Sequence, residues 1–105
     1  MSEVAVSIEA IDNEIANCED VMKQWQSKLD KLKEDEGYAV RRLEVLNQVS
    51  ERLSIGMSKD ANQATIDLVR NDLIEIRKGI SQENSKISQY TKILDVLLIL
   101  KEESK

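Results

Sequence analysis

Few side chains in this sequence have the chemistry for catalysis or metal binding. Among the 105 residues there is one cysteine, Cys18, and no histidine. Histidine is the commonest general base and metal ligand, and a disulfide needs two cysteines. Histidine-based catalysis, zinc sites of the Cys/His type and an internal disulfide framework are therefore excluded. We expect Cys18 to pack in a core as a small apolar residue.

Two further motifs fail for lack of residues at fixed positions. The acidic run Glu34-Asp35-Glu36-Gly37 resembles part of a calcium loop, but the first and twelfth positions of that loop hold Leu32 and Leu43 instead of oxygen ligands. Neither Gly56 nor Gly79 is followed by Lys-Ser or Lys-Thr in the frame of a phosphate loop. The sequence predicts no catalytic group, no cofactor, no metal and no evident small-molecule ligand, so we expect a protein that is not an enzyme.

The charge and apolar content also limit the possible partners. The 20 acidic and 15 basic residues give a net charge of −5, the wrong sign for a protein that neutralises nucleic-acid phosphates. The longest apolar run, Val96 to Leu100, is far shorter than the roughly 18 residues of a membrane span. Because no charged, apolar leader opens the chain and its cysteine is single, we expect a cytoplasmic protein.

The composition favours helices over strands. Hydrophobic residues make up 41% of the chain and charged residues 33%, but aromatic residues only 3%, and proline is absent. Folds built from strands and tight turns need frequent turn residues, which this chain lacks.

The apolar residues follow heptad spacing in two long segments. We letter the heptad positions a to g, with a and d forming the apolar seam. The first seam consists of Val4, Ile8, Ile11, Ile15, Cys18, Met22, Trp25, Leu29, Leu32, Ala39, Leu43, Leu46, Leu53 and Met57, and the second of Ile66, Val69, Leu73, Ile76, Ile80, Ile87, Tyr90, Leu94 and Leu97. Three polar residues interrupt the seams, Glu36, Ser50 and Glu83, and we expect each to reach outward to solvent or to fix the helix register.

These seams predict an all-α fold, a long antiparallel coiled-coil helical hairpin in one domain, 1–105. Its parts are a helix over 3–54, a turn over 55–59 and a helix over 60–103. Gly56 suits the left-handed position that follows a helix, and Ser58 or Asp60 could cap the next one.

Gly37 is the other possible break, which would give a three-helix bundle. The seam keeps its phase across Gly37, so a continuous or kinked helix is favoured.

Two registers are compatible with a short turn. One sets Glu36 against Glu83, two like charges within a seam. The other places Trp25 beside Ile87 and Ile15 beside Leu97, and closes the turn around Gly56. The second register is preferred because it separates the two carboxylates.

In a pair of helices, the sides that do not face the other helix are exposed to solvent. The C-terminal end of the second predicted helix is nevertheless apolar nearly all round. We therefore expect self-association, most simply as a dimer of hairpins that forms a four-helix bundle. The residues expected to form the interface are Ile8, Ile11, Ile15, Trp25, Tyr90, Ile93, Leu94, Leu97, Leu98 and Leu100.

The function predicted from the sequence is therefore a non-catalytic protein–protein interaction, with a second copy and with another protein, as in an adaptor, an assembly subunit or a small chaperone. A tetramer is compatible with the same pattern. Two alternatives stay open: a membrane-surface module that uses the apolar C-terminal segment, and a helical bundle that binds a small ligand.

Overall fold

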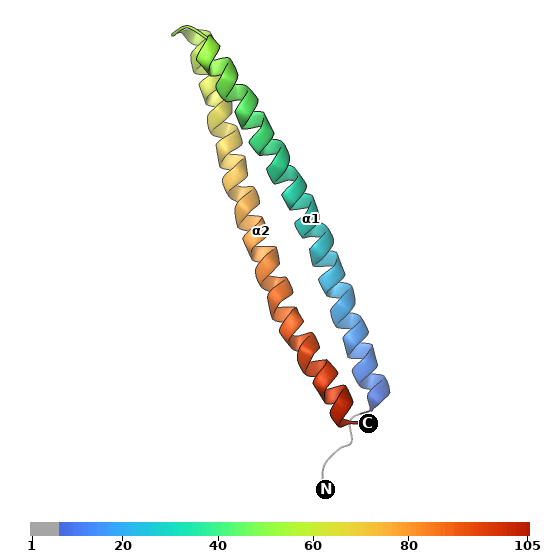
Figure 1. Cartoon of the computed structure of the whole chain (residues 1–105). Coiled ribbons are helices and arrows are strands. Elements are labelled where there is room, and N and C mark those ends of the chain that lie inside the picture. Colours follow the sequence, from blue (N-terminus) through green and yellow to red (C-terminus); the bar gives the residue numbers. More distant parts are fainter. Residues whose placement is uncertain (1–6) are drawn as a thin grey trace. The chain divides into compact units, whose positions relative to one another are not determined.

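Two long helices make up most of the computed structural model, which describes residues 7–105. Helix α1 spans Ile8–Arg52 and helix α2 spans Met57–Glu103, with no strand among the described residues (Figure 1). The predicted all-α fold of two long helices is confirmed and is consistent with a helical hairpin. The predicted start of the first helix at residue 3 lies outside the described residues.

The chain divides into two compact units. The turn unit, Leu29–Gln82, contains the end of α1, the connecting turn and the start of α2. The terminal unit, Met1–Lys28 with Glu83–Lys105, pairs the start of α1 with the end of α2. A single domain over 1–105 stays a prediction.

Helix α1 is continuous through Gly37, so the three-helix alternative is wrong. Glycine inside a helix costs about 1 kcal/mol relative to alanine, which is small beside the packing of a long apolar face. Ala39 is buried two residues further on, and the Glu36 carboxylate accepts a hydrogen bond from Arg77 Nε at 2.9 Å, so this segment of α1 is held against α2 from both sides of Gly37.

The turn differs in detail from the prediction. Helix α1 ends at Arg52 instead of residue 54, and α2 begins at Met57 instead of residue 60. Gly56 has φ +149°, and its carbonyl accepts a hydrogen bond from the Asp60 N–H at 3.0 Å. A residue whose carbonyl accepts the first helical bond is the N-cap, so Gly56 caps α2 and does not follow α1 as predicted. Ser58 and Asp60 consequently lie inside the first turn of α2.

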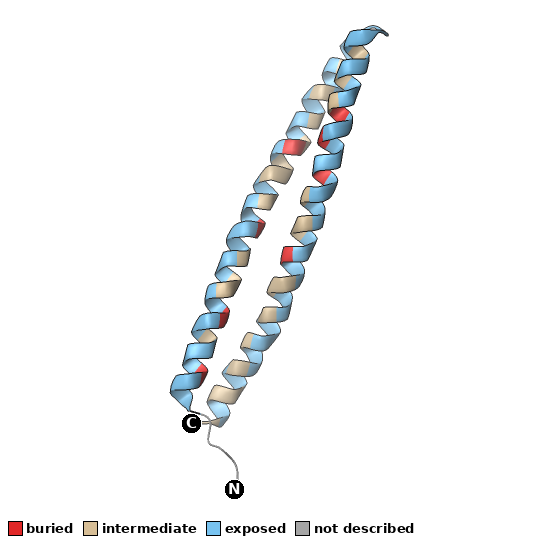
Figure 2. Cartoon of the chain, turned by 180° about the vertical axis from the view of Figure 1, so that it is seen from behind, coloured by how far each residue is buried: buried red, intermediate tan, exposed pale blue. Residues whose placement is uncertain are grey.

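The core of the turn unit forms where the seams of its two helical segments meet. Its buried apolar side chains are Leu29, Ala39, Ile66, Val69 and Leu73. Ala39, Val69 and Leu73 form one cluster, against which Val40, Leu43, Leu46 and Ile76 pack. Within each unit the buried residues lie on the side of one helix that faces the other (Figure 2). The 3.6-residue helical period places a and d positions on one face, and burial of that face stabilises the pair.

The contacts within each unit agree with the preferred register. Glu36 pairs with Arg77 and Glu83 pairs with Lys28, so the two carboxylates are not opposite each other. The Asn62 side-chain amide donates a hydrogen bond to the Leu46 carbonyl at 2.9 Å. The register that opposes Glu36 to Glu83 is therefore excluded.

Candidate interaction surface

The aromatic residues of the terminal unit contact each other across the two helices. The rings of Trp25 and Tyr90 are edge to face, with centroids 4.6 Å apart and planes at 82°. The Lys86 ammonium lies 5.7 Å from the Trp25 ring centroid, within the range of a cation–π interaction. Both rings are half-buried and fill the seam at this level, which is the packing role expected from their heptad positions.

Glu83 lies next to this aromatic pair and is buried. Its side chain is 3% exposed, and its Oε1 lies 3.4 Å from Lys28 Nζ and 3.3 Å from Lys86 Nζ. Of the two roles expected for Glu83, reaching outward to solvent is wrong, and fixing the helix register stays a prediction. Instead, one lysine from each helix reaches the carboxylate, and the side chains of Lys28 and Lys86 remain 64% and 45% exposed.

The electrostatics of Glu83 reflect two opposing effects. Burial raises the pKa of its carboxyl, but hydrogen bonds and positive charge from Lys86 and Lys28 outweigh burial and hold the pKa below the ordinary value of a glutamate. Glu83 Oε2 is buried without a hydrogen-bond partner. The carboxylate therefore joins the two helices through one oxygen only.

Cys18 is buried in the terminal unit, as expected for a small core residue. Its thiol donates to the Tyr90 carbonyl at 3.5 Å and lies 4.0 Å from the Met22 sulfur. Burial, and secondarily the charge of Glu19, raises the pKa of the Cys18 thiol. A raised pKa lowers the thiolate fraction, so this cysteine is a poor nucleophile.

The residues predicted to form the interface lie in the terminal unit but differ in exposure. Ile11 is 2% exposed, so packing within the chain already accounts for its side chain. Ile8, Ile93 and Leu98 are 36%, 48% and 46% exposed. The half-buried members are Ile15, Trp25, Tyr90, Leu94, Leu97 and Leu100.

Two hollows border the exposed end of α2. One, of about 310 Å³, is lined by Lys92, Ile93, Val96 and Leu97. The other, of about 230 Å³, shares Ile93 and Leu97 and extends to α1, with the lining Glu14, Asn17, Cys18, Val21, Tyr90, Ile93 and Leu97. Ile93 and Leu97 line both hollows and thus form a ridge between them. Ridges and grooves of this kind are the surface features through which helices pack against each other.

The predicted interface omits the most exposed apolar side chains of this region. Val96 is 63% exposed and Ile99 is 58% exposed. They occupy heptad positions c and f, on the side of α2 opposite the seam, and the signal in the sequence that includes them is the apolar run Val96 to Leu100.

The turn unit also carries exposed apolar side chains, which are Tyr38, Val45, Val49, Ile55, Met57, Leu68 and Ile74. Tyr38 and Val45, both at c positions, are 65% and 62% exposed and line a hollow of about 280 Å³ with Arg41 and Arg42. The lining of this hollow is therefore partly apolar and partly positively charged.

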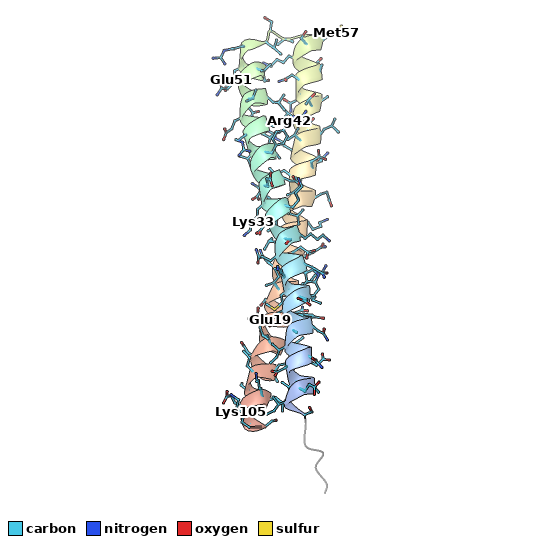
Figure 3. All side chains as sticks on the ribbon, turned by 90° about the vertical axis from the view of Figure 1, so that its right-hand side faces the viewer. Glu19, Lys33, Arg42, Glu51, Met57 and Lys105 are labelled. Atoms are coloured by element: carbon cyan, nitrogen blue, oxygen red, sulfur yellow. The ribbon has the colours of Figure 1, made fainter. Side chains whose placement is uncertain are left out.

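Charged side chains extend from the ribbon along the described helices, among them Glu19, Lys33 and Glu51 (Figure 3). Within residues 7–105, no group of three or more acidic, cysteine or histidine side chains is arranged to hold a metal ion. Neither described helix has a segment of sufficient length and apolarity to cross a bilayer. Comparison of the chain with protein-family models, with curated proteins and with solved structures gives no match, so a functional assignment depends on the side chains described above.

Proposed function

We propose that this chain is a non-catalytic interaction protein whose helical hairpin self-associates through the end of α2 and presents the assembled helices to another protein. The observation that carries the proposal is the row of exposed apolar side chains near the end of α2. They are Ile93, Val96, Leu98 and Ile99, which are 48%, 63%, 46% and 58% exposed.

Packing within the terminal unit is too sparse to cover these residues. Among its described residues, the buried apolar side chains are Ile11 and Cys18. Full burial of one valine, leucine or isoleucine side chain contributes about 1.5–3 kcal/mol. These four side chains are about half exposed, so covering them would recover about half of that value for each, which is still a sizeable fraction of a small protein's stability. A second copy that covers them would recover this free energy in both chains.

The other two functions considered from the sequence have less support. A membrane-surface role would place Lys92, Lys101 and Lys105 near lipid headgroups. The Lys101 ammonium is instead paired with Asp12 at 2.7 Å and that of Lys105 with Glu102 at 2.9 Å, which leaves Lys92 for such a contact. A ligand-binding role would use the hollow of about 380 Å³ in the turn unit. That hollow is open to solvent, and its lining mixes apolar side chains with three carboxylates and one arginine, which does not mark a ligand class. The lining residues are Asp35, Tyr38, Ala39, Arg42, Val69, Asp72, Glu75 and Ile76.

The test is Val96→Asp, measured by sedimentation equilibrium over a wide range of protein concentration. We expect the dimer dissociation constant to rise by about a hundredfold or more, because the substitution buries two carboxylates in the apolar contact of each dimer.

Val45→Asp is the matched control. Val45 is a valine at the same heptad position with 62% exposure, but it lies in the turn unit. We expect its variant to associate like the unmodified chain. Equal behaviour of the two variants, or a chain that is monomeric before any substitution, would contradict the proposal.

A further inference from the structure

We propose that the second copy docks on a four-residue stripe of α2, formed by Lys92, Val96, Ile99 and Glu103, in antiparallel orientation about a two-fold axis. This inference rests on the proposed self-association and adds the contact surface and the orientation of the two chains.

The four residues lie on one face of the helix. Their spacing of four, three and four residues is that of a seam, but it uses heptad positions f and c and therefore points away from the seam that packs against α1. Val96 and Ile99 in its centre are the most exposed large apolar residues that the structure describes in the terminal unit. Lys92 and Glu103 at its two ends are also exposed.

The order of residues along the stripe is self-complementary. When the stripe packs against a reversed copy of itself, Val96 of each chain meets Ile99 of the other, and Lys92 of each chain meets Glu103 of the other. Antiparallel helices pair residues of one seam position with residues of the other in this way. A two-fold axis repeats every contact, so one stripe supplies two apolar pairs and two ion pairs. A parallel alignment would set Lys92 against Lys92 and Glu103 against Glu103, which repel.

The charges at the ends of the stripe are available for a partner. Neighbouring charges of α2 are already used within the chain: Lys101 pairs with Asp12 at 2.7 Å, and Lys105 pairs with Glu102 at 2.9 Å. In the described part of the chain, neither Lys92 nor Glu103 takes part in an ion pair.

The contact extends over about three helical turns, which is short for a permanent dimer. Ile93, 48% exposed beside the stripe, widens it. We therefore expect an association that depends on concentration.

Charge reversal tests the stripe without altering its apolar centre. Lys92→Glu and Glu103→Lys, each alone, place like charges opposite each other twice per dimer, and each should raise the dimer dissociation constant by about tenfold at low salt. The double variant that carries both substitutions restores opposite charges and should return the constant to that of the unmodified chain. Sedimentation equilibrium measures all of these constants, and 1 M salt should reduce the differences between them, because the Debye length is then only about 3 Å.

Lys33→Glu is the control for Lys92→Glu, since it changes the net charge by the same amount and reverses an exposed lysine of the turn unit that takes part in no ion pair among the described residues. Circular dichroism checks that each variant retains its helices. If the unmodified chain dimerises but the single reversals behave like Lys33→Glu, the stripe is wrong and self-association stands. If the double variant is as weak as the single ones, the antiparallel pairing is wrong. A chain that is monomeric at every concentration would overturn both proposals.

Discussion

Glu83 is the described residue at which charge and packing are most closely linked. It replaces an apolar residue in the α2 seam, is 3% exposed, and holds Lys28 of α1 and Lys86 of α2 through the same oxygen. A buried carboxylate with charged partners is poor at adding stability but restricts which alignments the helices can adopt, because any shift removes its partners. We expect Glu83 to contribute chiefly to the register of the helix pair.

The low pKa of Glu83 predicts a pH dependence of stability. A carboxyl whose pKa is lower in the folded chain than in the unfolded chain stabilises the fold above the unfolded pKa, and this contribution is lost as the pH falls through the folded pKa. The free energy of unfolding should therefore fall on acidification below the ordinary range of carboxyl groups. Glu83→Gln should lower stability at neutral pH and lose part of this acid dependence, as measured by urea denaturation at a series of pH values.

Glu75→Gln provides the comparison, because Glu75 is 71% exposed and its ion pair with Lys78 at 3.6 Å lies at the surface. Exposed pairs contribute about 0–1 kcal/mol, so this variant should differ little from the unmodified chain. Identical acid dependence of the two variants would show that Glu83 is not held ionised by its lysines.

At the scale of the helices, Gly37 and Gly56 lie in different backbone conformations, so the same substitution should have opposite effects on stability at the two positions. Gly37 lies inside α1, and a Cβ there would meet only the far end of the Arg41 side chain at 3.3 Å. Gly37→Ala should therefore raise the free energy of unfolding by about 0.5–1 kcal/mol. Gly56→Ala should instead lower it by about 1–3 kcal/mol, because the positive φ at the N-cap of α2 strains any residue with a Cβ.

Thermal or urea denaturation of both variants checks this prediction. The substitution is the same at both positions, so the opposite signs depend on the structure alone. A loss of stability in Gly37→Ala would argue that α1 is broken or sharply bent at this residue.

The two helices were predictable because heptad spacing is repeated many times along each, so single faults such as Ser50 do not hide it. Their ends were not predictable to the residue. Gly56 satisfies the sequence requirements of both a position after α1 and a cap before α2, and only the hydrogen bond from Asp60 distinguishes the two. The burial of Glu83 was also out of reach, because it depends on Lys28, a residue far away in the sequence.

The candidate surface was predicted only in part, because the depth of burial of a residue depends on contacts that the sequence pattern does not show. The apolar run at the end of α2 pointed to the correct region, but periodicity does not tell how deeply each member is buried. Ile11 and Ile8 both belong to the α1 seam, yet Ile11 is 2% exposed and Ile8 is 36% exposed. The predicted interface was drawn from seam positions and the positions that flank them. It therefore left out Val96 and Ile99, which lie on the opposite side of the helix.

At the scale of the whole molecule, the proposed self-association links the remaining features. The turn unit has a continuous buried cluster around Ala39, Val69 and Leu73, whereas the terminal unit combines a buried ion cluster with exposed apolar residues at the end of α2. A surface that is costly to leave in water, on the unit with less apolar burial, is typical of a site that another chain covers.

The most direct test of self-association is the mass of the unmodified chain in solution, measured by light scattering on a size-exclusion column at several loading concentrations. The chain weighs 12.0 kDa, and we expect the mass to rise with concentration toward twice that value. A mass that stays at 12.0 kDa at every concentration would contradict the account, because the exposed end of α2 would then be stable in water without a second copy.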